Sequence, residues 1–182
     1  LPIKIIYDMS GFSTIGFTSF IPYLGKIFNA KRIILKFLKE NHYDLAIFID
    51  NQGFNIPIAR KFKKYGVKCI YYFPPIVSVW DRKNAKIIPK VFDRIICPFK
   101  NDHEMYIKNS GNSEFVGHPF LDSVKITKSL GEIKNELNIP EVNILIGLFP
   151  GSRKQEINSL LCPILQAAKI LKNKLKNVSF IL

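Results

Sequence analysis

Asp50, Trp80 and His118 each follow an apolar run of this chain, and their side chains suit different kinds of ligand contact. Asp50 ends the run YDLAIFID. Held partly away from water, its carboxylate could take a proton from a substrate hydroxyl, or it could merely cap the next turn. Trp80 ends PPIVSVW and offers a flat face for packing or recognition. His118, in the Gly-His-Pro bend after SEFV, could contact a ligand or fill a structural role.

A fourth candidate lies in the segment FPGSRKQEI, where an apolar run meets a helical pattern. Gly151 permits a close backbone approach, and Ser152 is predicted to cap the helix with Gln155 in a capping box. The free N–H groups of a helix start favour an anion. Arg153 adds a permanently charged, forked donor that suits phosphate oxygens. The segment therefore predicts a phosphate site, although it is neither a Walker loop nor a G-x-G-x-x-G fingerprint.

Alternating elements position these residues. Apolar runs predict short buried strands at residues 43–50, 67–73, 92–99, 113–119 and 143–149. Helical patterns predict helices at residues 20–40, 55–65, 83–90, 101–110, 129–138 and 154–175. This alternation predicts an α/β fold with a mainly parallel sheet. Ligands of such sheets bind beyond the carboxyl ends of the strands, which is where the candidate residues stand.

A domain boundary is expected near residue 140. The polar segment SLGEIKNELNIPEVN ends its helical pattern at Ile139-Pro140, and a new strand begins at Asn143. We therefore predict one domain at residues 1–140 and the beginning of a second at residues 141–182. Because the chain begins without methionine and stops inside an apolar run, we expect it to be the middle of a longer protein.

The net charge of +13 and the pI near 9.7 favour an anionic partner: nucleic acid, an anionic membrane or a phosphorylated substrate. The helix at 20–40 carries a basic stripe beside aromatic residues, which is typical of a membrane-surface patch or of an ordinary solvated face. The predicted patch comprises Phe20, Tyr23, Lys26, Arg32 and Lys36. The predicted apolar face comprises Phe20, Leu24, Ile27, Phe28, Ile34, Leu35 and Leu38.

No metal or cofactor is expected. Cys69, Cys97 and Cys162 follow no metal-ligand spacing and lie in or beside apolar runs, so we expect buried thiols. The chain contains no Asp-x-Asp pair, His/Cys cluster or nucleophile elbow. These absences favour a metal-free mechanism.

Taken in order, FIDNQGFN, SVW, FVGHPFLD and FPGSRKQEI resemble the lipid-A-disaccharide synthase family of two-domain GT-B glycosyltransferases. The resemblance covers essentially the whole chain. It implies a Rossmann-like parallel sheet with helices on both faces, comprising most of an acceptor-binding domain and the start of a nucleotide-sugar-binding domain. The implied reaction joins UDP-2,3-diacylglucosamine to 2,3-diacylglucosamine 1-phosphate with inversion, giving a disaccharide 1-phosphate and UDP.

The resemblance also assigns roles to residues. Asp50 would be the general base on the acceptor 6-hydroxyl, and Arg153 with Ser152 would stabilise the departing UDP. Glu156 and Gly151 match the nucleotide-binding segment of the family. Three further residues match as site-shaping positions: Asn55, Trp80 and His118. The implied location is the cytoplasmic face of the inner membrane, with no nucleic-acid partner.

Some segments depart from the family pattern. Residues 14–19 read TIGFTS, with serine where the family has an acid, and PFK at residues 98–100 replaces Pro-Phe-Glu. We expect these changes to bear on acyl-chain or acceptor preference rather than on the reaction class. The family's N-terminal Gly-rich loop and later donor loop lie outside the chain, so residues 1–182 alone are expected to be inactive.

Two alternatives stay open at this point. Another GT-B enzyme with a UDP-sugar donor and a lipid-linked acceptor, as in peptidoglycan synthesis, would share the basic and apolar patch. A non-catalytic nucleic-acid-binding module fits the net charge. The cations, however, are spread over several helices, and no nucleic-acid motif is found.

Overall fold

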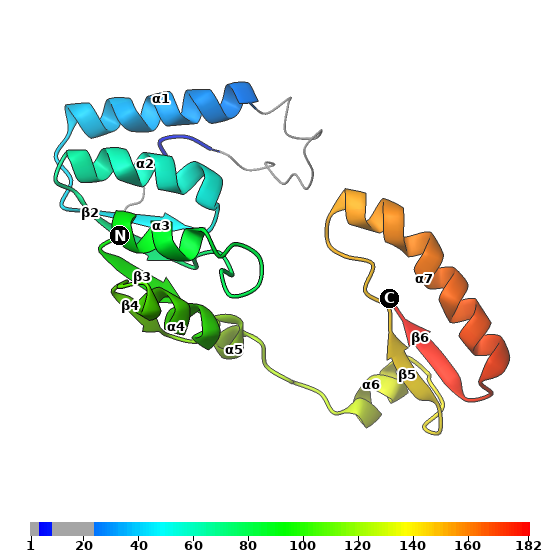
Figure 1. Ribbon diagram of the computed structural model, residues 1–182. Coiled ribbons are helices and arrows are strands. Elements are labelled where there is room, and N and C mark those ends of the chain that lie inside the picture. The colour runs from blue at the N-terminus through cyan, green and yellow to red at the C-terminus, as the bar shows by residue number, and fades with distance from the viewer. Residues whose placement is uncertain (1–3, 9–23) are drawn as a thin grey trace. The chain divides into compact units, whose positions relative to one another are not determined.

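The computed structural model describes residues 4–8 and 24–182 of the chain (Figure 1). Contacts divide the chain into two compact units, Leu1–Val124 and Lys125–Leu182, which we call the first and the second unit. The predicted functional boundary near residue 140 lies inside the second unit and stays a prediction. Phe20 and Tyr23 of the predicted membrane patch lie outside the described residues.

The first unit is an α/β structure with a parallel sheet, as predicted. Its elements are α1 (Leu24–Glu40), β1 (Leu45–Ile49), α2 (Gln52–Lys64), β2 (Lys68–Tyr72), α3 (Asn84–Val91), β3 (Arg94–Cys97), α4 (Lys100–Lys108), β4 (Ser113–Phe115) and α5 (Phe120–Ser123). The strands lie in the order β1-β2-β3-β4, and every neighbouring pair is parallel. Their carboxyl ends therefore meet at one edge of the sheet, where the candidate residues follow them.

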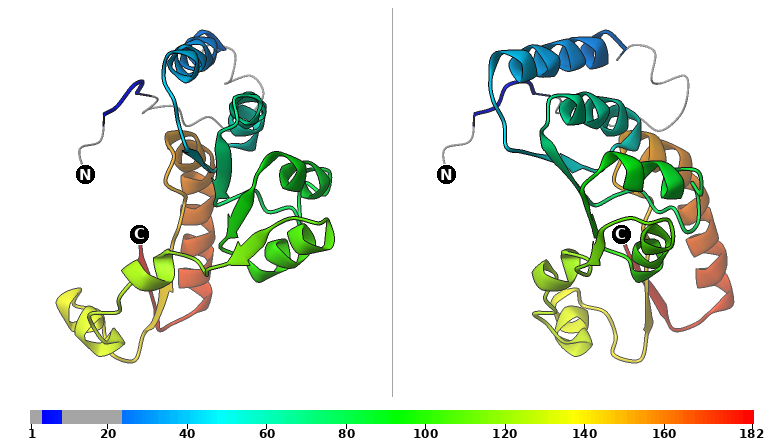
Figure 2. Two further views of the ribbon diagram at one scale, coloured as in Figure 1. Left: turned by 90° about the vertical axis from the view of Figure 1, so that its left-hand side faces the viewer. Right: turned by 60° about the vertical axis from the view of Figure 1, so that its left-hand side comes forward.

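The helices that connect these strands, α2, α3 and α4, pack over one face of the sheet (Figure 2). Right-handed crossovers between successive neighbouring strands place every connecting helix on the same side. Phe48 and Tyr71 point into this core, and their rings contact Phe92 at centroid distances of 5.5 and 4.4 Å. On the other face of β1, Ile47 and Ile49 are 61% and 60% exposed. Helices on that second face stay an expectation.

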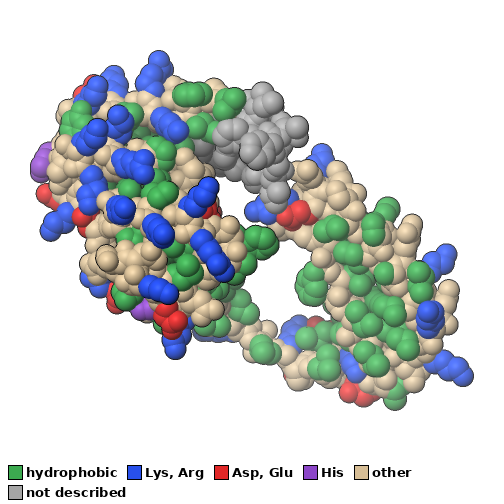
Figure 3. Space-filling model, in the orientation of Figure 1, with side chains coloured by type: hydrophobic (Ala, Val, Ile, Leu, Met, Phe, Trp, Pro, Cys, Tyr) green, Lys and Arg blue, Asp and Glu red, His purple; other side chains and the backbone are tan. Residues whose placement is uncertain are grey.

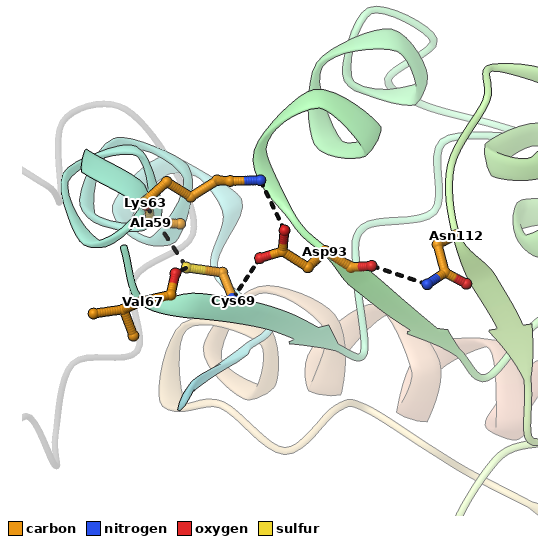
Figure 4. A network of polar contacts seen from close by, with 6 residues as sticks. All are labelled: Ala59, Lys63, Val67, Cys69, Asp93 and Asn112. Atoms are coloured by element: carbon orange, nitrogen blue, oxygen red, sulfur yellow. Dashed lines mark hydrogen bonds and ion pairs between the residues drawn. The ribbon is translucent and has the colours of Figure 1, made fainter. Parts of the chain in front are cut away.

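A polar network fixes the opposite, amino edge of this sheet (Figure 4). The Asp93 carboxylate accepts hydrogen bonds from the Cys69 N–H at 2.7 Å and from Lys63 Nζ at 2.9 Å. Burial alone would raise the pKa of Asp93, but these two donors outweigh it and hold the pKa below its ordinary value. The Asp93 carbonyl accepts from Asn112 at 3.0 Å, so one residue joins α2, β2, β3 and the segment before β4. The charged side chains of Lys63 and Asp93 therefore stabilise the fold at this edge.

Two of the cysteines are buried, as expected, and one is not. Burial raises the pKa of the Cys69 and Cys97 thiols to about 11, so both stay protonated and unreactive at neutral pH. The expectation of a buried Cys162 was wrong, because this residue lies on the exposed face of its helix.

Helix α1 follows its predicted pattern with two corrections. Ile27, Ala30 and Leu38 are buried, whereas Phe28 is 67% exposed and Leu24, at the start of the helix, is exposed as well. Phe28 directly follows Ile27, and a step of 100° along a helix turns it away from the core. The basic members of the predicted patch, Lys26, Arg32 and Lys36, are exposed. No helix of residues 4–8 and 24–182 is both long and apolar enough to cross a membrane.

The second unit contains α6 (Leu130–Glu136), β5 (Ile144–Gly147), α7 (Lys154–Lys174) and β6 (Val178–Ile181). Strands β5 and β6 pair in parallel, with α7 as the connection between them. Ala168 of α7 and Val178 of β6 are buried in this unit. The predicted strands and helices are thus found with ends shifted by a few residues, whereas β6 and the short α5 were not predicted.

Candidate functional site

Asp50 lies on a strained turn at the carboxyl end of β1. Both Asp50 and Asn51 have a positive φ, 50° and 30°, which costs a residue with a side chain about 1 kcal/mol or more. The side-chain amide of Asn55 donates to the carbonyls of Ile49 at 2.9 Å and of Asp50 at 2.7 Å. The hydroxyl of Tyr71 donates to the same Asp50 carbonyl at 2.7 Å. Three hydrogen bonds from two side chains therefore hold this turn in its strained form.

Both supporting side chains belong to the interior. Asn55 is 8% exposed and Tyr71 is fully buried. Burial, and secondarily the nearby Asp50 charge, raises the pKa of Tyr71 well above its ordinary value, so the hydroxyl keeps its proton and stays a donor. The turn is therefore fixed by the core of the first unit.

The Asp50 carboxylate is exposed, and no hydrogen bond or ion pair of its oxygens is found within the described residues. Shielding from water, the condition stated for a role as a base, is therefore not provided by the first unit itself. Capping of α2 falls to Asn51, whose side chain accepts from the Phe54 N–H at 3.2 Å. Helix α2 consequently begins at Gln52 rather than at residue 55. Asp50 thus has no capping role, and its carboxylate is available to a ligand.

Trp80 lies on the loop that follows β2 and is 84% exposed. The loop itself is anchored: Tyr106 donates its hydroxyl to the Pro75 carbonyl at 3.2 Å. Asp102, 1% exposed, accepts from the Ser78 N–H at 2.8 Å. Two buried side chains of α4 therefore hold a loop that presents an exposed indole.

The same loop is tied to the start of α2. Gln52 donates to the Asp81 carboxylate at 3.1 Å, and the side-chain amide of Asn84 donates to Gln52 at 2.6 Å and to Asp81 at 2.8 Å. Because Gln52 comes two residues after Asp50, the Asp50 turn and the Trp80 loop share one hydrogen-bonded frame.

His118 follows β4 in an aromatic cluster. Its ring lies 5.2 Å from Phe73, 5.6 Å from Phe99 and 4.7 Å from Phe120, between centroids. Its Nδ1 accepts from the Phe120 N–H at 3.2 Å, so the neutral ring carries its proton on Nε2 and can donate to a ligand. Phe73 follows β2, the strand next to β1, so the His118 ring lies at the same edge of the sheet as Asp50.

In the second unit, Glu156 occupies the predicted anion site. Its Oε2 accepts from the N–H groups of Ser152 at 3.1 Å and of Arg153 at 3.2 Å. Its Oε1 pairs with the Arg153 guanidinium at 2.8 Å. The Arg153 side chain, and then its backbone N–H, hold the pKa of Glu156 below its ordinary value. A phosphate would have to share or displace this carboxylate to reach the same donors.

The predicted capping residues of α7 were wrong by one position. The residue at the cap position is Arg153, whose side chain cannot accept a hydrogen bond, and the Glu156 carboxylate accepts from its N–H; Ser152 and Gln155 do not fill these positions. A glutamate that also pairs with Arg153 outcompetes a neutral glutamine. Gly151, at φ 104°, is required here, because a Cβ would lie 2.6 Å from Glu156 Oε2. The loop before α7 is thus shaped by one carboxylate packed against a glycine.

The predicted site residues therefore fall into two groups. Asp50, Asn55, Trp80 and His118 follow or support strand ends of the first unit, and Gly151, Ser152, Arg153 and Glu156 follow β5 in the second. Supporting residues that sequence reasoning missed include Tyr71, Gln52, Asp102 and Tyr106. Tyr71 is hidden in the apolar run CIYYF, where only its inward position marks it. The described residues contain no group of three His, Cys, Asp or Glu side chains that could hold a metal ion.

Comparison with known proteins agrees with this arrangement of motifs. Residues 2–182 match the family model described as lipid-A-disaccharide synthetase. The chain is 31% identical over 180 residues to the lipid-A-disaccharide synthase of Coxiella burnetii. This alignment covers 99% of this chain and 48% of that protein. It is 32% identical over 180 residues to the enzyme of that name from Geobacter metallireducens, covering 99% and 47%. The chain spans about half the length of the curated relatives it matches.

Proposed function

Because the chain belongs to the lipid-A-disaccharide synthetase family, we propose that it is part of an inverting glycosyltransferase of lipid A synthesis. The protein would join UDP-2,3-diacylglucosamine to 2,3-diacylglucosamine 1-phosphate, forming the disaccharide 1-phosphate and UDP. The observation that carries this proposal is the Asp50 turn, which presents an unpaired carboxylate from a rigid, strained backbone.

Asp50 acts as the general base of this reaction. Its carboxylate takes the proton of the acceptor 6-hydroxyl while that oxygen attacks the anomeric carbon of the donor sugar. Base catalysis of this kind contributes about 10²–10⁴-fold when the base is held in register with the hydroxyl. Asn55 and Tyr71 supply that positioning, because they fix the backbone that carries the carboxylate. A bound lipid acceptor would exclude the water that reaches Asp50 in the free protein.

Arg153 stabilises the leaving group. Cleavage of the bond to the donor sugar leaves negative charge on the UDP diphosphate, and a fixed guanidinium near it lowers the barrier. Glu156 keeps the Arg153 side chain folded back over the start of α7 at 2.8 Å. Exchange of this internal carboxylate for the diphosphate would bring the cation and the Ser152 N–H onto the donor.

His118 and Trp80 contact the acceptor lipid away from the reacting hydroxyl. The Nε2 proton of His118 suits a phosphate or hydroxyl oxygen, and the exposed Trp80 indole suits an acyl chain or sugar face. The exposed cations of α1 favour contact with an anionic membrane, and the proposed location is its cytoplasmic face.

The test uses the full-length protein that contains this chain, with UDP release measured in the presence of both substrates. Asp50→Asn is expected to lower kcat about 10²–10⁴-fold. Arg153→Ala is expected to lower it about 10²–10³-fold. The matched control is Asp44→Asn, since Asp44 is an acid before β1 whose side chain is 99% exposed. If Asp50→Asn turned over at the parental rate, Asp50 would not be the general base. If the protein used a peptidoglycan-type acceptor and not the diacylglucosamine phosphate, it would be a different glycosyltransferase.

A further inference from the structure

A groove of about 450 Å³ lies between α3 and α4 in the first unit. Its charged lining residues are Arg82, Lys83, Lys86 and Lys108, and its apolar floor is formed by Ala85 and Met105. Ala85 is buried, and Met105 packs against the hydrophobic core, so the floor is fixed. The groove therefore joins a rigid apolar base to a cationic rim.

The four rim cations form no ion pair with another part of the chain that the structure describes. Within the described residues, no ion pair or side-chain hydrogen bond is found for Arg82, Lys83, Lys86 or Lys108. Other cations of the same unit are paired, such as Lys63 with Asp93 and Arg94 with Glu114. Figure 3 shows many Lys and Arg side chains and few acids on the face that carries α2, α3 and α4. Like charges gathered around one groove repel each other, and a bound anion would relieve that repulsion.

The acid next to the rim in sequence does not pair with the rim cations. Asp81 precedes Arg82, but its carboxylate accepts hydrogen bonds from Gln52 and Asn84. These bonds fix the start of α3 and leave the following cations unpaired. The positive charge of the groove therefore comes from several cations on a backbone that these hydrogen bonds hold in place.

Exposed apolar side chains stand immediately before the rim. Val79 and Trp80 are 63% and 84% exposed, and their loop is held by Asp102 and Tyr106 of α4. Cations beside exposed aromatic and apolar groups are typical of surfaces that enter the headgroup region of a bilayer. A free phosphate would use the rim but would gain nothing from the apolar floor or from Trp80.

We propose that the groove between α3 and α4 binds the headgroup of an anionic phospholipid in a bilayer. The lipid phosphate pairs with the rim cations, the glycerol and upper acyl atoms lie on Ala85 and Met105, and Trp80 enters the adjacent headgroup layer. The inference deepens only the membrane contact of the proposed function. It does not depend on Asp50 or Arg153, and it names a site separate from the basic stripe of α1.

The experiment measures sedimentation of the full-length protein with phosphatidylcholine vesicles that do or do not contain phosphatidylglycerol. Each basic residue near an anionic surface is worth about a fivefold change in partitioning, so K83Q/K86Q/K108Q is expected to lose about a hundredfold on the anionic vesicles. The control K61Q/K64Q/K90Q removes the same charge from exposed positions of the first unit outside the groove. We expect the control to change partitioning much less. Equal losses by the two triple variants would overturn the site.

Two further arms separate the possible ligands. Met105→Gln is expected to weaken vesicle binding without changing the affinity for inorganic phosphate, because only the apolar floor is altered. Full competition by inorganic phosphate would reduce the groove to an anion site and overturn the lipid assignment. Unchanged vesicle binding by the groove variant, with lost binding of single-stranded RNA, would assign the cations to nucleic acid instead. UDP release by the groove variant from detergent-dispersed substrates should be unchanged, so the outcome is independent of the proposed transfer reaction.

Discussion

The turn before α2 and the loop before α7 both join a strand end to a helix, yet they are held in different ways. Buried side chains of the first unit, Asn55 and Tyr71, fix the carbonyls around Asp50. One solvent-accessible carboxylate, Glu156, holds the N–H groups of Ser152 and Arg153. A proton acceptor needs a fixed direction, whereas a site that binds and releases a diphosphate needs donors that can change partners. The difference therefore matches the two roles that we propose.

The largest stability effect is expected from Asn55→Leu. The substitution removes the side-chain donor of the Ile49 carbonyl and one of the two donors of the Asp50 carbonyl, which keeps Tyr71. A buried unsatisfied acceptor costs about 1–3 kcal/mol. Urea unfolding of the full-length protein should show this loss in the transition of the first unit, together with reduced kcat. Asn41→Leu is the control, because its amide caps α1 at an exposed position. A variant as stable as the parent would show that the core does not hold the Asp50 turn.

The second-largest loss of stability is expected from Gly151→Ala. The residue has φ 104°, where a side chain costs about 1–2 kcal/mol, and its new Cβ would push Glu156 off the N–H groups that it caps. We expect lower stability and weaker UDP binding in calorimetry. The control is Gly131→Ala, since Gly131 lies in helix α6 of the same unit with open space around its Cα. That change should stabilise the protein by up to about 1 kcal/mol. A loss of the same size in both variants would contradict the special role of the loop.

Tyr71→Phe should have a smaller effect than Asn55→Leu. It removes one of the two donors to the Asp50 carbonyl, and the amide of Asn55 still bonds that oxygen. We expect a loss of about 0.5–1.5 kcal/mol. If Tyr71 positions the base, kcat should fall while the KM for both substrates stays unchanged, and equal effects on kcat and KM would indicate a merely structural role. The control is Tyr65→Phe, an exposed tyrosine at the end of α2.

The sequence predicted the strands that precede both regions, but not the backbone turn at Asp50 or the cap of α7. Continuous apolar runs placed β1 and β5 and therefore the residues that follow them, since a buried strand must end where polar residues begin. The left-handed turn at Asp50 and Asn51 could not be foreseen, because neither residue is glycine and the cost is met by contacts with the distant Tyr71. Likewise, the choice of Glu156 over Gln155 depends on the Arg153 side chain, which spacing rules do not include.

The errors about exposure have a related cause. Periodicity placed Phe28 on the buried face of α1 and apolar neighbours placed Cys162 in the core, but both are exposed. A helical pattern shows which residues share a face and not where that face ends. Only the packing partner, here α2 for helix α1, sets its width.

The smallest effect is expected from Glu156→Gln, a change in the loop before α7. The Arg153 side chain and backbone hold the pKa of Glu156 below its ordinary value, so the carboxylate stabilises the fold above the pKa of the unfolded chain. That contribution is lost as the pH falls through the lower folded value. The variant should therefore unfold at nearly the parental urea concentration at neutral pH, with a slightly flatter acid limb below about pH 4.5. Because glutamine carries no charge to compete with a diphosphate, UDP should bind the variant at least as tightly as the parent. Weaker UDP binding would mean that Glu156 orients Arg153 for the donor rather than occupying its place.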